Sequence, residues 1–156
     1  EKPIQTEVKS NNNHYSGQPG TKARPFNLNT APNPSRVRTV VPIAKTDITV
    51  ANMQILNNGG ETQLHSHTGM DGFWMVLRGR VKFYGPGDEL LAELSQHEGI
   101  LLPRGAEYWF ESSGDEDLEI LQMAGFDKNV KTERIDAAPH KLDLSTIKVD
   151  NITQRI

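Results

Sequence analysis

The feature that most constrains the fold is the close alternation of short β-prone runs with clusters of turn-forming residues. Gly, Pro, Asn, Ser and Asp gather at NNGG (57–60), GPGD (85–88), HEG (97–99), PRG (103–105) and SSGDED (112–117). The runs between them lack a long 3.6-residue apolar period, which disfavours helical and βαβ architectures. Short, closely spaced strands of this kind predict an antiparallel sandwich or barrel. The predicted strands are residues 37–43, 48–56, 62–67, 73–84, 90–94, 100–103, 107–111 and 118–123.

Composition excludes several functional classes. The 156 residues include no cysteine, so disulfides, cysteine–zinc sites, Fe–S clusters and thiol nucleophiles are excluded. The net charge is −3, so the chain lacks the excess of basic residues that is typical of a nucleic-acid-binding protein. No apolar run approaches the ~20 residues of a membrane span, and the N-terminus has no signal-like apolar segment. We expect no nucleic-acid or membrane partner. The first residue is Glu rather than Met, so localisation stays unknown, with the cytoplasm as the default.

The sequence divides into a polar arm, a β-rich body and a polar tail. Residues 10–35 are rich in Asn, Pro, Gly and Ser, so they cannot bury enough apolar surface to offset the entropy of ordering. We therefore predict an extended or disordered arm over residues 1–36, a β-barrel over 37–126 and a tail over 127–156. The alternating KLDLSTIKVD segment (141–150) predicts an added edge strand within the tail.

The sharpest candidate site is the segment GGETQLHSH at residues 59–67. Residues i and i+2 of a strand point to the same face, so Gln63, His65 and His67 are expected to project together. Two imidazoles on one face suit a borderline divalent metal ion.

The context of these histidines resembles the cupin superfamily. Its first motif has the form G-x5-H-x-H-x(3,4)-E-x6-G, and Gly59, His65, His67 and Gly79 fall on that spacing. The position of the motif's glutamate ligand is occupied by Gly72. The resemblance implies a small RmlC-like protein with a single double-stranded β-helix, an all-β jelly-roll barrel.

The second cupin motif, G-x5-P-x-G-x2-H-x3-N, is matched at Pro103 and Gly105. Tyr108 stands at its histidine ligand and Ser112 at its asparagine. Two of the four metal ligands that the resemblance implies are therefore present, and the metal site is degenerate.

Three interpretations of the site are open. In the first, His65 and His67 bind a divalent ion (Fe, Zn, Ni or Mn) that is completed by Gln63, Asp71, Tyr108 or water. In the second, the barrel has lost its metal and binds a small organic molecule, with the histidines as hydrogen-bonding groups. In the third, the histidines are only satisfied interior polar groups.

Strand parity indicates what else lines the cavity. If position 72 faces inward, Trp74 and Arg78 do so too, and if Tyr108 faces inward, so does Phe110. These side chains are candidates for substrate binding, although Trp74 and Phe110 also suit simple barrel filling and Arg78 suits a solvated strand end. Tyr108 is the best candidate catalytic group, because a buried phenol needs a hydrogen-bond partner and can donate a proton.

Two functional hypotheses follow. One is a cupin that binds a metal through His-x-His and a small organic molecule, with a dioxygenase-, isomerase- or lyase-type reaction. The alternative is a non-catalytic binding barrel without metal, so enzymatic activity stays open. Phe73, Met75 and Leu77 are expected on the outer face of the barrel, where an exposed apolar surface favours a homodimer.

Overall fold

The computed structural model describes residues 22–28, 38–57, 59–137 and 149–151. The described chain is almost entirely β-strand, with one short 3-10 turn, η1 (Pro86–Asp88). No helix in these ranges is long and apolar enough to cross a membrane. The strands are β1 (Arg38–Lys45), β2 (Thr49–Leu56), β3 (Gly60–His67), β4 (Met70–Arg78), β5 (Arg80–Tyr84), β6 (Leu90–Leu94), β7 (Gly99–Leu102), β8 (Tyr108–Ser113), β9 (Leu118–Phe126), β10 (Arg134–Asp136) and β11 (Val149–Asn151).

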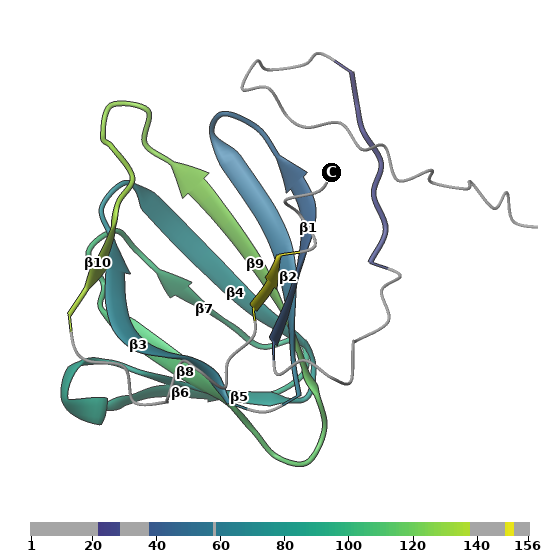
Figure 1. Ribbon diagram of the computed structural model, residues 1–156, viewed down its shortest axis with the longest axis vertical. Helices are drawn as coiled ribbons and strands as arrows, with labels where there is room; N and C mark the ends of the chain where they lie inside the picture. Colours follow the sequence, from purple (N-terminus) through teal and green to yellow (C-terminus); the bar gives the residue numbers. More distant parts are fainter. Residues whose placement is uncertain (1–21, 29–37, 58, 138–148, 152–156) are drawn as a thin grey trace, which may run out of the picture.

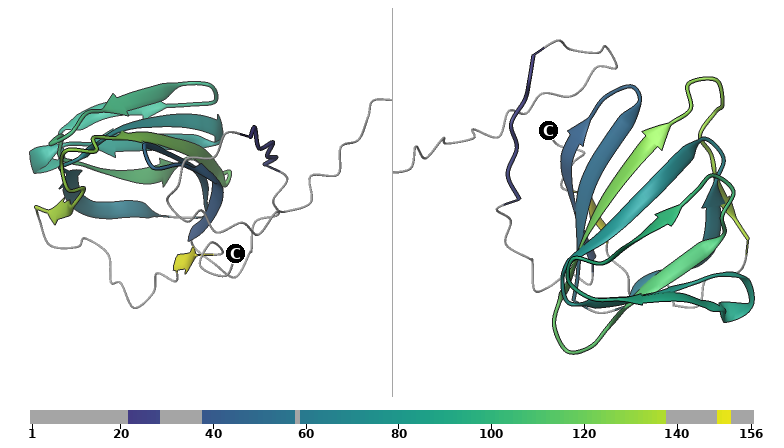
Figure 2. Two further views of the ribbon diagram at one scale, coloured as in Figure 1. Left: turned by 90° about the horizontal axis from the view of Figure 1, so that it is seen from above. Right: turned by 180° about the vertical axis from the view of Figure 1, so that it is seen from behind.

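The strands form two facing sheets (Figure 1). One has six strands in the order β11-β1-β2-β9-β4-β7, and the other has five in the order β10-β3-β8-β5-β6. The two layers are separate in the views of Figure 2 as well. Within the described residues, the strand pairings are antiparallel except that of β11 with β1, which is parallel. The predicted all-β class with a double-stranded β-helix is confirmed.

Alternation along β4 shows how the sequence separates the core from the surface. Trp74 and Val76 are buried, whereas Phe73 and Met75 between them are 52% and 39% exposed. This period of two is what an antiparallel sheet with one solvated face requires. The inward residues of both sheets meet in one apolar core, which includes Leu56, Trp74, Val76, Val81, Phe83, Leu94, Leu102, Tyr108, Phe110, Leu118 and Ile120.

The predicted single strand at residues 73–84 is in fact two strands, β4 and β5. They meet at Gly79, whose φ of +82° lies in the left-handed region. A Cβ at this position would also lie 2.7 Å from the carbonyl oxygen of Asp117. Glycine is therefore required both by the backbone conformation and by the close approach of the neighbouring turn.

The tail adds strands to an edge of each sheet. β10 pairs with β3, so Arg134 lies opposite His67 and Asp136 opposite His65. β11 pairs with β1 at the edge of the six-stranded sheet. The predicted strand at 141–150 lies outside the described residues except at 149–150, which belong to β11. Of the predicted arm, only residues 22–28 are described, and they contain no strand.

Candidate functional site

The two histidines and the tyrosine form one cluster on the inner face of the five-stranded sheet. His65 on β3 lies opposite Tyr108 on β8, and their ring centroids are 4.4 Å apart. The rings of His65 and His67 meet edge-on at 5.2 Å, and those of His67 and Tyr108 lie 6.5 Å apart. His65 and Tyr108 are buried, whereas His67 is half-buried. His67 is thus the more accessible of the two imidazoles.

A short hydrogen bond fixes the protonation pattern of His65. Its Nδ1 lies 2.6 Å from the backbone oxygen of Gln63. A carbonyl oxygen only accepts hydrogen bonds, so Nδ1 carries the proton and Nε2 of the neutral ring has the lone pair. Metal-binding histidines are commonly oriented by such a bond from the other ring nitrogen.

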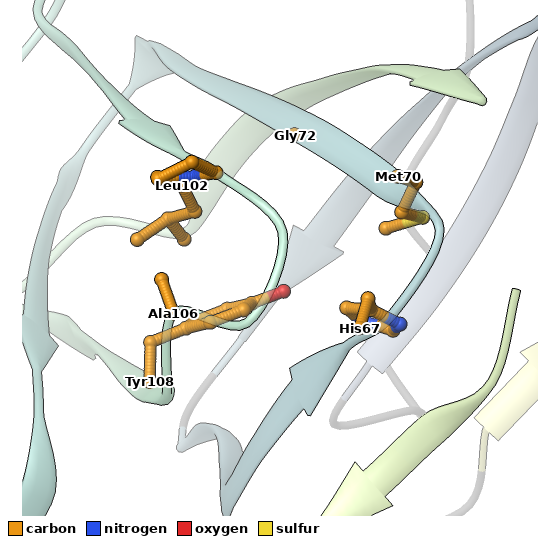
Figure 3. Close-up of a pocket in the computed structure, with 7 residues that line it drawn as sticks. His67, Met70, Gly72, Leu102, Ala106 and Tyr108 are labelled. Carbon is orange, nitrogen blue, oxygen red and sulfur yellow. The ribbon is translucent and has the colours of Figure 1, made fainter. Parts of the chain in front are cut away.

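A small cavity lies between this cluster and the six-stranded sheet (Figure 3). Its volume is about 10 Å³, room for about one water molecule. The hydroxyl end of Tyr108 extends across the cavity, and Gly72 on β4 contributes no side chain to its wall. The cavity is lined by His67, Met70, Gly72, Leu102, Pro103, Ala106 and Tyr108. Its wall is therefore mostly apolar, with the imidazole and the phenol as its polar groups.

Two predicted metal ligands are placed differently from the histidines. The Asp71 carboxylate accepts a hydrogen bond from the backbone N–H of Arg104 at 2.9 Å, and the Arg104 Nε lies 3.3 Å from the same oxygen. Asp71 thus holds the turn after β7 and does not line the cavity. The side chain of Gln63 is buried, and its backbone oxygen orients His65.

The structure places Trp74 and Phe110 in the aromatic core. The Phe110 ring lies 5.1 Å from that of Trp74 and 5.2 Å from that of Phe83. Neither Trp74 nor Phe110 lines the cavity. The indole Nε1 of Trp74 is buried and has no hydrogen-bond partner among the residues that the structure describes.

Arg78 does not share the inward face that parity predicted for it. The register between β4 and β9 shifts between Val76 and Arg78, which interrupts the alternation. The Arg78 side chain is exposed at the strand end, where its guanidinium pairs with Glu116 at 3.4 Å and Glu119 at 3.8 Å.

Sequence reasoning missed the apolar cavity wall and a set of interior carboxamides. Asn52 and Gln122 face the core from β2 and β9, and Asn52 Nδ2 donates to Gln122 Oε1 at 3.2 Å. Asn52 Oδ1 is buried, and no hydrogen-bond donor reaches it from the described part of the chain. The alternation of β2 and β9 marks these positions as inward once their registers are known, but no motif singles them out.

The donor set fits a borderline divalent ion in part. Two imidazoles converge, and the hydrogen bond to Gln63 O orients the ring of His65. Among the described residues, no group of three or more His, Cys, Asp and Glu side chains comes together. The histidines would therefore supply two ligands, and Tyr108, water or a bound molecule would supply the others.

Similarity to known proteins agrees with this fold. Residues 52–123 match the family model for the cupin domain. No protein in a search of curated sequences matches the chain significantly.

Solved structures show the same architecture. A conserved Klebsiella pneumoniae protein with a double-stranded beta-helix domain is 15% identical, with a TM-score of 0.61 over 76% of this chain and 100% of that one. An RmlC-like cupin from Desulfovibrio desulfuricans is 17% identical, with a TM-score of 0.53 over 63% and 91%. A Thermus thermophilus protein is 21% identical, with a TM-score of 0.52 over 60% and 87%. At these identities the likeness establishes the fold alone. Together with this likeness, the domain match identifies residues 52–123, from β2 to β9, as a cupin domain with the double-stranded β-helix fold.

Proposed function

We propose that this cupin binds a divalent metal ion and a small organic molecule at the cluster of His65, His67 and Tyr108. The observation that carries the proposal is the convergence of the His65 and His67 rings at 5.2 Å, because two imidazoles on one face are ligands that suit a borderline divalent ion. The hydrogen bond from His65 Nδ1 to Gln63 O orients one of these rings. The cavity next to His67 and Tyr108 supports it, since it has room for about one water-sized particle.

In this proposal His65 and His67 hold the ion, and the other positions are left for water and the ligand. A metal bound there supplies Lewis-acid polarisation of a ligand oxygen. Tyr108 orients the ligand and donates a proton to it, since its hydroxyl extends across the cavity (Figure 3). The apolar wall of Met70 and Leu102 excludes bulk water from this side.

A specific observation favours a second candidate, a metal-free binding barrel. No third His, Cys, Asp or Glu joins the histidines in the part of the chain that the structure describes, and the Asp71 carboxylate is engaged by Arg104. In that case His65, His67 and Tyr108 bind an organic molecule directly by hydrogen bonds.

Elemental analysis separates the two candidates. The protein is incubated with Co²⁺, desalted and compared with His65→Ala/His67→Ala. The matched control is His97→Asn, which removes an exposed imidazole at a left-handed position that asparagine tolerates. Near-stoichiometric cobalt in the wild type and in the control, but not in the double variant, supports the metal site. Equal cobalt in all three proteins, or none in any, favours the metal-free barrel.

We also propose that the chain forms a homodimer through the outer face of the six-stranded sheet. Leu101, Phe73 and Met123 lie opposite one another on β7, β4 and β9, and are 53%, 52% and 48% exposed. A contiguous apolar stripe that crosses a sheet face to its edge strand is typical of a surface that a partner covers. A second copy offers the same stripe to this one, as an isologous interface requires.

A further inference from the structure

A second hollow, separate from the cavity beside the histidines, lies at the rim of the barrel. It is a groove of about 600 Å³ between the turn that joins β1 to β2 and the loop that joins β9 to β10. Both segments lie at the same end of the molecule (Figure 1). A groove of this size has room for a small organic molecule, whereas the cavity beside the histidines holds about one water molecule. The groove is lined by Lys45, Thr46, Asp47, Phe126, Asp127, Lys128, Val130 and Thr132.

Apolar side chains form part of the groove wall. Phe126 at the end of β9 is half-buried, and its backbone N–H donates a hydrogen bond to the oxygen of Ile48 at 2.8 Å. Val130 in the following loop is 43% exposed. A ligand that covers these two side chains removes apolar surface from water, which stabilises the complex. The groove therefore favours a ligand with an apolar body.

The carboxylates of the groove are already paired, and one of its two lysines is not. Lys128 donates a hydrogen bond to the Asp47 carboxylate, which holds the pKa of this group below its usual value. The Asp127 carboxylate pairs with Arg104 at 2.8 Å. Among the described residues, no ion pair engages the ammonium group of Lys45. Lys45 is therefore the cation that is left for a ligand.

Two further groups make the Lys45 end of the groove suitable for an anion. The guanidinium of Arg24 donates a hydrogen bond to the backbone oxygen of Lys45 at 3.4 Å, so a second cation lies nearby. The hydroxyl oxygen of Thr46 accepts hydrogen bonds from the backbone N–H groups of Ile48 and Thr49 at 3.2 and 3.1 Å. These two bonds do not use the O–H of Thr46, which is a donor for a ligand.

Hydrogen bonds hold the loop wall of the groove in place before a ligand binds. The backbone N–H of Asp127 donates to the oxygen of Gly69 at 2.9 Å. The Thr68 hydroxyl donates to the oxygen of Lys131 at 2.7 Å and accepts from the N–H of Glu133 at 2.9 Å. A wall that is fixed in this way lowers the entropy cost of binding, because the loop does not have to be ordered by the ligand.

We propose that this groove binds a small amphipathic carboxylate, with its carboxylate at Lys45 and its apolar body against Phe126 and Val130. A carboxylate accepts hydrogen bonds from both the ammonium group and the Thr46 hydroxyl, and its single charge matches that of Lys45. The groove shares no lining residue with the cavity beside the histidines. The inference therefore goes beyond the proposed function and does not depend on a bound metal.

Calorimetric titration with octanoate tests this assignment. Octanoate is the probe, because it joins one carboxylate to an apolar chain. We expect saturable binding to the wild type, with one octanoate per chain. 1-Octanol has the chain without the charge, and acetate has the charge without the chain. Each is expected to bind more weakly than octanoate by about tenfold or more, because it lacks one of the two interactions.

A matched pair of variants tests the position of the carboxylate. Lys45→Met removes the ammonium group and keeps an unbranched side chain, so the affinity for octanoate should fall by about tenfold or more. Lys131→Met is the control. Lys131 lies between the lining residues Val130 and Thr132, but its side chain is 85% exposed and does not line the groove. This control should bind octanoate as the wild type does.

Several outcomes would overturn the inference. Absence of saturable octanoate binding removes the groove as a ligand site. Equal affinities of octanoate and 1-octanol for the wild type, or equal octanoate affinities of the wild type and Lys45→Met, remove the carboxylate from it. An affinity that falls as the protein concentration rises would mean that another copy of the chain occupies the groove. The wild-type titrations decide the inference even if a variant does not fold.

Discussion

Replacing Phe110 by alanine tests whether this side chain fills the core or lines the ligand site. Phe110 is fully buried, and its ring contacts those of Trp74 and Phe83 at centroid distances of 5.1 and 5.2 Å. Truncating a buried phenylalanine costs about 3–5 kcal/mol. Each aromatic pair adds about 0.5–1.5 kcal/mol beyond the buried area, so we expect Phe110→Ala to lie at the upper end of that range.

Urea denaturation followed by tryptophan fluorescence measures this loss. For a small domain the free energy of unfolding falls by about 1–3 kcal/mol per molar urea, so the midpoint is expected to fall by about 2 M. Phe26→Ala is the matched control, because Phe26 is 57% exposed and lies outside the barrel strands. The control should change the stability by less than about 0.5 kcal/mol.

A small effect of Phe110→Ala would refute this argument. A loss below about 1 kcal/mol would mean that the ring does not pack as a core side chain, since that is well under the range for a buried phenylalanine. If ligand affinity fell at the same time, Phe110 would instead belong to the wall of the binding site.

Three further predictions concern other parts of the molecule. Phe73→Lys should convert the proposed dimer to a monomer in light scattering, and an unchanged mass would remove the outer sheet face as the interface. Burial, with a hydrogen bond to Glu111, raises the pKa of Tyr84. The folded state therefore holds this proton more tightly, and the free energy of unfolding of the wild type should fall as the pH rises above about 10. Denaturation curves of Tyr84→Phe should lack this pH-dependent loss. Asp71→Asn should destabilise the turn at Arg104 without changing Co²⁺ affinity by calorimetry; a loss of affinity would make Asp71 a metal ligand after all.

Local sequence patterns predicted the barrel strands well because their causes are local. The inward positions of β4 follow from alternation alone, and Trp74 and Val76 lie where parity puts them. The pattern did not separate β4 from β5, because the β-prone run resumes directly after Arg78, Gly79 and Arg80, and Gly79 is the one turn-forming residue between the two strands. β10 was missed because three exposed residues carry no apolar period.

The candidate site was predictable where it depends on one strand and not where it depends on several. His65 and His67 lie together because they are two residues apart on β3. The contact of Asp71 with Arg104 joins residues 33 positions apart, and no spacing rule reveals it. Arg78 was misplaced because a register shift between β4 and β9 arises from strand pairing rather than from the sequence of β4 itself.

The short strand β10 has a consequence for how the site opens. β3 carries both histidines and is held between β8 and β10, and on the β10 side the partner strand is three exposed residues long. Local opening is least costly where few apolar contacts and many exposed backbone hydrogen bonds are involved. We expect β10 to detach from β3 far more often than the barrel unfolds, so that amide hydrogen exchange along this seam is fast. When β10 is detached, β3 would become a temporary edge strand of its sheet. The rate at which ions and ligands exchange at the proposed site would then depend on the local opening of β10 and not on the global stability of the core.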